Sequence, residues 1–158
     1  TVRKNVINKL FSHDKDSYYQ TGDNREMAQY LEDPFTDFTY TNNAYNEVLE
    51  LIREVSLNQN IKKIPNYVSI LILSGAKDPF GDFGIGPKWL YDNLKAQGQK
   101  DITLKLYNDS HNDLLHDKQR LEIYQDILDW LNNRTFTKVH KSMMVLQILG
   151  IMVLLVWK

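Results

Sequence analysis

The sequence contains no cysteine, and this absence excludes several kinds of chemistry. Without a thiol, the chain cannot form a disulfide, bind a metal through thiolates or use a cysteine nucleophile. The absence does not identify the redox compartment, because a chain without cysteine suits either environment. No other pattern in the 158 residues indicates a bound group, so we expect neither a metal ion nor an organic cofactor.

Net charge is also almost absent, since 19 basic residues stand against 20 acidic ones and leave a formal charge of −1. Nucleic-acid-binding domains normally carry a strongly basic patch, and here Lys and Arg are interspersed with acids. We therefore expect no nucleic-acid partner. Hydrophobic content of 42% and charged content of 25% are ordinary for a soluble globular protein. The length corresponds to one domain with a sizeable core.

The chain lacks an apolar run of the length that a membrane-spanning helix requires, which is about 20 residues. The most apolar stretch, residues 143–157, contains only Gln147 and Gly150 as non-apolar members and is flanked by lysines. A membrane anchor, an interfacial segment, a core helix and a strand pair broken at Gly150 all stay open for it. No signal peptide is visible in residues 1–4. We expect a cytoplasmic protein, with membrane contact through residues 143–157 as an alternative.

Two helices are expected in the first 60 residues. The Asp-Asn pair at 23–24 is suited to cap a helix over 25–32, and Pro34 ends it because proline disfavours helical geometry in the residue before it. A second helix is expected from Thr41 to the Asn-rich run at 58–60. Its apolar residues recur at helical spacing: Tyr45, Val48, Leu49, Ile52 and Val55.

Two strands and two further helices are expected after residue 60. Residues 68–73 form a short uncharged run that ends at turn residues, which favours a strand buried on both faces. Residues 101–107 alternate apolar with polar side chains, as in a strand near a sheet edge. A helix is expected to begin at Pro87 and to stop at Gly98, and the last one covers residues 118–131. The inward positions are predicted to be Trp89, Leu90 and Leu94 in the first helix, and Leu121, Tyr124, Ile127, Leu128 and Leu131 in the second.

This order of strand, helix, strand and helix predicts an α/β domain with parallel strands. Asp78 follows the first strand and His111 follows the second. Because adjacent parallel strands end at the same edge of a sheet, we expect the two side chains within hydrogen-bond reach, about 2.6–3.2 Å, or somewhat farther apart without a ligand. A carboxylate bound to an imidazole fixes the tautomer and supports the imidazolium. The alternatives are that Asp78 only caps an Asp-Pro turn, that His111 is a solvated loop residue, or that His116 is the base.

Three segments of the chain resemble the α/β-hydrolase superfamily, and more closely its monoacylglycerol lipase or lysophospholipase branch. They are residues 70–81, residues 104–107 leading to His111, and residues 124–131. The resemblance implies that Asp78 is the catalytic acid and His111 the general base. Residues 31–35 resemble the end of the cap segment that covers the acyl pocket in that family. The histidine segment departs from the family pattern, because it lacks the expected Gly and the acidic residue directly after the His.

The nucleophile of that family is missing from the sequence. It stands in a G-x-S-x-G motif before the Asp and the His, and none of the seven glycines here is followed two residues later by Ser. We therefore expect the carboxyl-terminal half of an α/β-hydrolase fold, with parallel strands and flanking helices, preceded by a helical cap segment. The expected divisions are a cap over 1–60, a core over 61–133 and an apolar tail over 134–158. Unless the tail is a membrane anchor, we expect it to fold back over the apolar surface that the missing half leaves bare.

The resemblance implies a fragment of a serine ester hydrolase that acts on acylglycerol or lysophospholipid-type esters. Phe80, Phe83 and Phe35 are the candidates for lining its acyl pocket. A strand at 68–73 needs a neighbour on each side, so the expected partners are the missing amino-terminal half or a second copy. The alternative is a non-catalytic α/β interaction fragment, or remnant, that needs a partner chain.

Overall fold

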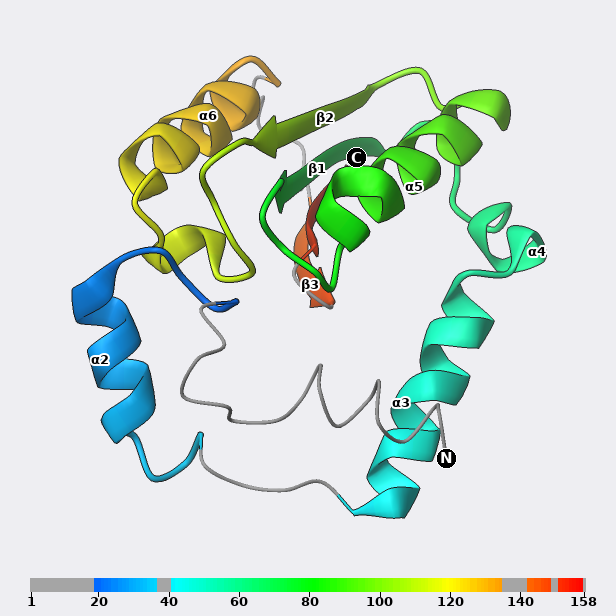
Figure 1. The fold of residues 1–158 in the computed structure, drawn as a ribbon. Coiled ribbons are helices and arrows are strands. Elements are labelled where there is room, and N and C mark those ends of the chain that lie inside the picture. Colours follow the sequence, from blue (N-terminus) through cyan, green and yellow to red (C-terminus); the bar gives the residue numbers. More distant parts are fainter. Residues whose placement is uncertain (1–18, 37–40, 135–141, 149–150, 158) are drawn as a thin grey trace.

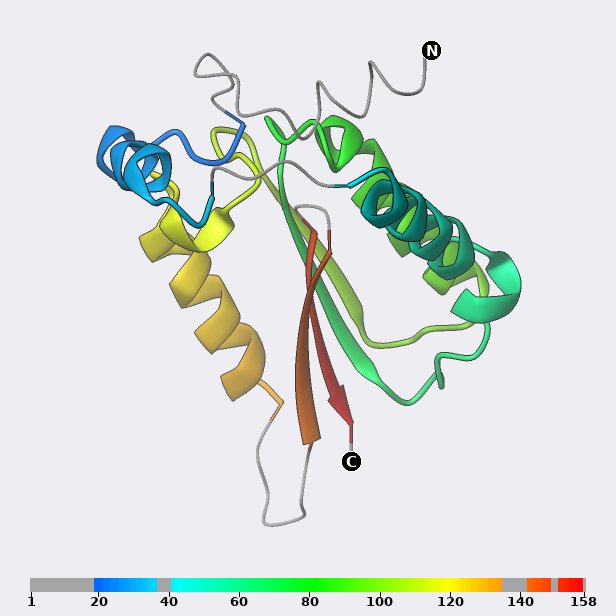
Figure 2. The ribbon, with the colours of Figure 1, turned by 90° about the horizontal axis from the view of Figure 1, so that it is seen from below.

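The structure, a computed structural model, describes residues 19–36, 41–134, 142–148 and 151–157. A four-stranded sheet in the order β2-β1-β4-β3 stands between helices on both of its faces (Figures 1 and 2). Helix α6 (Arg120–Asn132) covers one face and helix α5 (Ile85–Ala96) covers the other (Figure 2). The strands are β1 (Ser69–Gly75), β2 (Ile102–Tyr107), β3 (Ser142–Ile148) and β4 (Ile151–Trp157).

Strands β1 and β2 are parallel, and helix α5 (Ile85–Ala96) connects them, so the predicted α/β arrangement is confirmed for this part of the chain. The central strand β1 is buried on both faces, as its uncharged sequence predicted. Alternate residues of β1 enter two separate cores. The core on the α6 side contains Leu71, Leu73, Tyr107, Leu114, Ile123 and Trp130. The core on the α5 side contains Ile61, Val68, Ile70, Ile72, Leu94 and Ile102.

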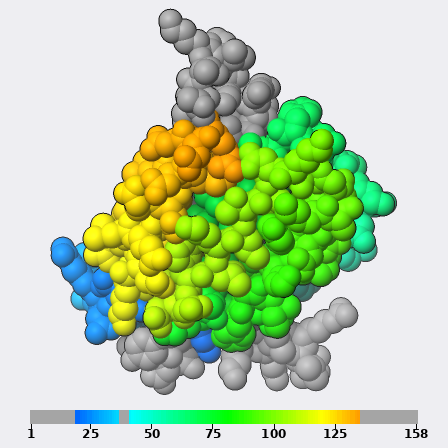
Figure 3. Space-filling model, turned by 90° about the horizontal axis from the view of Figure 1, so that it is seen from above, coloured from blue at the N-terminus to red at the C-terminus, as the bar shows by residue number. Residues whose placement is uncertain are grey.

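Strand β2 forms one edge of the sheet, as its alternating pattern predicted. In the space-filling view from above, this edge lies between the surfaces of α6 and α5 (Figure 3). Its two faces differ in chemistry. Lys105 and Tyr107 both contact Asp126 of α6, whereas Leu104 packs against the core on the α5 side. Lys105 and Tyr107 therefore face α6 and share the carboxylate of Asp126.

The predicted inward face of helix α6 (Arg120–Asn132) is wrong in part. Leu121, Tyr124 and Leu128 are 76%, 39% and 52% exposed, whereas Ile123 and Trp130 are buried. Of the predicted set, only Ile127 and Leu131 pack against the core. The helix carries two apolar stripes, and tertiary contact with Leu71, Leu73 and Leu114 selects the one that includes Ile123 and Trp130.

Helix α5 also differs from its prediction. It begins two residues before Pro87, which is its third residue and is buried. Trp89 is 43% exposed, while Leu94 is buried and Leu90 packs against the core on the α5 side. The exposed Trp89 shows that an aromatic side chain near the start of a helix does not by itself identify the buried face.

The first two predicted helices are confirmed as α2 (Asn24–Glu32) and α3 (Asn42–Val55). The Asp23 carboxylate accepts from the first amides of α2, and the Thr41 hydroxyl does the same for α3. The Asn-rich run does not merely end a helix, because it forms the one-turn helix α4 (Asn58–Ile61) and places Ile61 in the core. No residue of α3 is buried, so its apolar stripe makes little contact with the sheet.

The apolar tail forms a strand pair, one of the four alternatives that its sequence left open. Strand β4 is antiparallel to β3 on one side and to β1 on the other, with Leu71 opposite Leu154. The neighbour that β1 was predicted to lack is thus supplied by the chain itself. The predicted break at Gly150 lies outside the described residues. Within the described ranges, no helix is long and apolar enough to cross a membrane.

Candidate active site

The loops that follow β1 and β2 meet at the carboxyl edge of the two parallel strands. Backbone amides of the first loop donate to carbonyls of the second, with Ala76 N to Tyr107 O at 2.9 Å and Lys77 N to Ser110 O at 3.0 Å. Gly75 permits this approach, because a Cβ there would lie 2.2 Å from the Ser110 carbonyl oxygen. The predicted convergence of the two loops is therefore observed.

Asp78 lies at this edge and is fully buried. Its Oδ1 accepts a hydrogen bond from the Phe80 amide at 2.8 Å, whereas its Oδ2 has no hydrogen-bond partner among the described residues. Burial raises the pKa of Asp78 to about 6, against the opposing effects of the Phe80 and Gly81 amides and of the His111 ring. The turn after β1 thus holds a carboxylate that is only partly satisfied.

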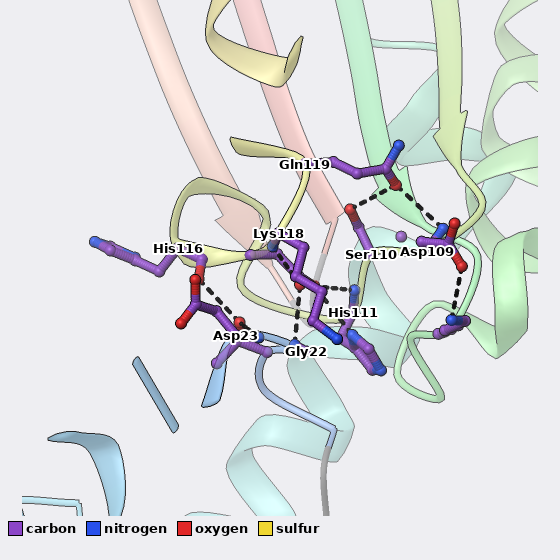
Figure 4. A network of polar contacts seen from close by, with 12 residues as sticks. Gly22, Asp23, Asp109, Ser110, His111, His116, Lys118 and Gln119 are labelled. Atoms are coloured by element: carbon purple, nitrogen blue, oxygen red, sulfur yellow. Dashed lines mark hydrogen bonds and ion pairs between the residues drawn. The ribbon is translucent and has the colours of Figure 1, made fainter. Parts of the chain in front are cut away.

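His111 lies in the loop after β2, and its ring contacts a different carboxylate. Its Nδ1 is 3.0 Å from Oδ2 of Asp117, and its backbone amide donates to the same oxygen at 2.5 Å. The backbone amides of Gly22 and Lys118 donate to its Oδ1, and Figure 4 labels Gly22, His111 and Lys118 within this network of polar contacts. The His111 side chain is 16% exposed, whereas Asp117 is fully buried.

The predicted hydrogen bond between Asp78 and His111 is thus not formed in the structure. Both groups lie at the same edge of the sheet, and the His111 charge acts on Asp78, but the ring nitrogen is held by Asp117. The physical reason is local, because the turn over residues 114–116 brings Asp117 back against the start of its own loop. The catalytic roles of Asp78 and His111 stay predictions.

Burial by itself would raise the pKa of Asp117, yet four hydrogen bonds together lower it below its usual value. They come from the backbone amides of His111, Lys118 and Gly22 and from the His111 ring. Asp117 is therefore an ionised carboxylate. Asp117 was not among the residues predicted for the site, although an acid six positions after a loop histidine is a visible signal in the sequence.

His116, the rival base, occupies a more open position on the same loop. Its Nδ1 lies 2.9 Å from Asp113 Oδ2, and its side chain is 58% exposed. The pair therefore forms on the surface, apart from the contact of His111 with Asp117. Within the described part of the chain, no group of three or more His, Asp or Glu residues is arranged to hold a metal ion.

The three phenylalanines proposed for an acyl pocket have different environments. Phe80 is half-buried and contacts Asp78 through its amide, whereas Phe83 and Phe35 are 60% and 85% exposed. Their role in substrate binding stays a prediction. The two serines near the motifs, Ser74 and Ser110, are fully buried, so neither is placed to attack a substrate from solvent.

The family model described as serine aminopeptidase, S33, matches residues 1–119 of the chain. This range includes β1, β2, Asp78, His111 and Asp117. No curated protein and no solved structure matches the sequence. The family match covers about three quarters of the chain and agrees with the parallel strands whose carboxyl edge carries the candidate site. The chain therefore belongs to the serine aminopeptidase S33 family of the α/β-hydrolase superfamily.

Proposed function

We propose that this chain carries the acid and the base of a serine ester hydrolase whose nucleophilic serine stands outside the printed sequence. The observation that supports the proposal is the His111 imidazole, which a buried carboxylate holds at the carboxyl edge of two parallel strands. This edge is where open α/β sheets display their functional side chains. The family supplies the reaction class, since its members are hydrolases of the α/β type.

In this proposal His111 acts as the general base. As the serine oxygen attacks the ester carbonyl carbon, Nε2 of His111 accepts the hydroxyl proton and then gives it to the leaving alkoxide. A water molecule repeats the sequence on the acyl-enzyme and releases the acid. Asp78 supports the positive charge that develops on the ring, because its carboxylate lies at the same edge and interacts with that charge.

The proposed substrates are acylglycerols or lysophospholipid-type esters, in keeping with the branch that the sequence resembles. Phe80, Phe83 and Phe35 supply the apolar contacts for the acyl chain in this proposal. Two of these side chains are already exposed to solvent, and an apolar acyl chain that covered them would remove that surface from water. The segment over residues 1–60, to which α2 and α3 belong, acts as the cap in this proposal.

The test compares the 158-residue chain with a longer, completed protein in which an upstream segment carries G-x-S-x-G. The printed chain is expected to show no turnover of a short-chain p-nitrophenyl ester. It lacks the nucleophile, and the absence of oxyanion donors costs about a further 3 kcal/mol of transition-state stabilisation. The completed protein is expected to hydrolyse the ester and to react with a serine-directed fluorophosphonate.

His111→Gln and His116→Gln form a matched pair in the completed protein. Loss of the base is expected to lower kcat by about 10⁴-fold or more, whereas removal of the surface histidine leaves kcat within a few fold. Fluorophosphonate-sensitive turnover by the printed chain alone would contradict the proposal. Equal effects of the two substitutions would refute the assignment of His111. A completed protein without any hydrolase activity would favour the non-catalytic interaction fragment.

A further inference from the structure

The carboxylate of Asp117 has only hydrogen-bond donors around it. Oδ1 accepts from the amides of Gly22 at 2.9 Å and Lys118 at 2.7 Å, while Oδ2 accepts from the amide of His111 at 2.5 Å. Each of these three N–H groups can only donate, so both oxygens act as acceptors. Three fixed amide donors favour the ionised form, and together with the ring contact they hold the pKa of Asp117 below its usual value against the effect of burial.

The fourth contact fixes the state of the His111 ring. Nδ1 lies 3.0 Å from Oδ2 of Asp117, and an acceptor oxygen at that distance requires a proton on Nδ1. In a neutral imidazole the proton on one nitrogen leaves the lone pair on the other. Nε2 is then the basic nitrogen, and no hydrogen bond among the described residues occupies it. This is the tautomer that a general base needs.

Asp78 differs from Asp117 both in its hydrogen bonds and in its relation to the His111 ring. It accepts one amide hydrogen bond, from Phe80, and the second oxygen has no partner among the described residues. The two carboxylates at this edge thus play unequal parts towards His111. One makes a direct contact with the ring, and the other acts on it only through its charge.

Residues 20–22, the Gly22 segment, precede α2 and lie against the other side of the His111 ring. A Cβ on Gly22 would lie 2.9 Å from Cε1 of His111, so any larger residue there would displace the imidazole from its position. The segment is fixed to the His111 loop by further bonds. The Thr21 hydroxyl donates to the His116 carbonyl at 2.9 Å, and the Asp113 amide donates to the Gln20 carbonyl at 2.7 Å. The ring is thus confined between Asp117 and the Gly22 backbone.

We propose that Asp117 is the positioning residue of His111, and that it fixes the Nδ1–H tautomer while it anchors the Gly22 segment against the ring. This inference rests on the proposed function only in that it gives His111 the role of base. Asp117 acts through His111 and does not touch the substrate. Asp78 supports the ring charge without determining which ring nitrogen carries the proton.

The test is the ¹⁵N spectrum of the histidine rings in the full chain, recorded at a pH where the neutral ring predominates. In the wild type, His111 is expected to be mostly the Nδ1–H tautomer. Asp117→Asn is expected to reduce that form to a minority, because one acceptor oxygen becomes a donor. Asp78→Asn is expected to leave it unchanged. Asp113→Asn is the matched control, since it removes the carboxylate beside His116 three residues earlier in the loop.

Three results would overturn the inference: a predominantly Nε2–H ring in the wild type, a tautomer change in Asp78→Asn, or an unchanged ring in a folded Asp117→Asn. If Asp117→Asn fails to fold, the wild type and Asp78→Asn still decide, because both must keep Nδ1–H. The spectrum requires no catalysis. If the proposed esterase function is wrong, the spectra are still expected as described. If Asp117 is not the positioning residue, the spectra will differ from that expectation whatever the esterase assay shows.

Discussion

For both carboxylates of the candidate site, burial raises the pKa and hydrogen bonds lower it. Both Asp78 and Asp117 are fully buried, but Asp117 accepts four hydrogen bonds and Asp78 accepts one through Oδ1. The pKa of Asp117 therefore falls, whereas desolvation raises the pKa of Asp78 from 3.8 to about 6. At neutral pH, Asp78 is a buried charge that the fold only partly compensates.

This difference predicts a pH dependence of stability. Between about pH 4 and pH 6 the folded chain keeps a proton on Asp78 that the unfolded chain has released. The stability from this group is therefore fully present below pH 4 and is lost as the pH rises through 6, by up to about 3 kcal/mol. Asp78→Asn removes the titration. Relative to the wild type, its free energy of unfolding in urea is expected to increase between pH 4.5 and pH 7.5.

Asp117 makes the opposite contribution, since its stabilisation is lost as the pH falls. For that reason the measurement is the difference between Asp78→Asn and the wild type at each pH, not the wild-type profile alone. If the two proteins show parallel profiles between pH 4.5 and pH 7.5, the raised pKa of Asp78 is wrong.

At the scale of the element, α6 shows how one helix can offer two apolar faces. Ile123 is fully buried between β1 and the turn at Leu114, whereas Leu121 is 76% exposed two residues earlier. Periodicity in the sequence could not choose between these faces, because both recur at helical spacing. The position of the helix on the sheet makes the choice.

A matched pair of alanine substitutions tests that choice. Ile123→Ala is expected to lower the free energy of unfolding by about 2–5 kcal/mol, because it removes a packed side chain and leaves a cavity. Leu121→Ala is expected to change it by less than about 0.5 kcal/mol. Denaturant unfolding of both variants gives the two values. A larger cost at Leu121 than at Ile123 would show that α6 is rotated relative to the structure.

At the scale of the whole molecule, the tail completes the sheet around β1. Six residues of β1, Ser69 to Ser74, have partners in β4 on one side, and the parallel strand β2 pairs on the other. The central strand therefore has its backbone groups satisfied from both directions. The sequence predicted that such a strand needs two neighbours and that the tail, unless it is an anchor, folds back over bare apolar surface, but it did not predict that the tail pairs with β1 as a strand.

Deletion of residues 135–158 is expected to expose the β1 edge and to cause association. An unpaired apolar edge strand is a template for pairing with another chain. Light-scattering chromatography should then show oligomers or aggregates, with lower solubility than the full chain at the same concentration. A deletion variant that stays monomeric and unfolds as cooperatively as the full chain would show that β4 does not protect β1. If the deletion instead moves the protein from the membrane fraction to the soluble fraction without association, the tail is a membrane anchor.

The sequence by itself determined the local features. Three features follow from interactions within a few residues, so they could be read without a structure: the uncharged run of β1, the cap at Asp23 and the edge pattern of β2. The sequence also placed Asp78 and His111 after neighbouring parallel strands, which fixed the edge of the sheet where the site lies.

Only the tertiary structure decided the contacts between distant segments. Tertiary packing determines which face of α6 is buried and pairs strand β4 of the tail with β1. It also brings the His111 ring into contact with Asp117 instead of Asp78. Each of these outcomes depends on which surfaces meet in space and on the backbone of a turn, such as the approach of Gly22 to the His111 ring. Such contacts depend on three-dimensional packing, and residue spacing along the chain does not encode them.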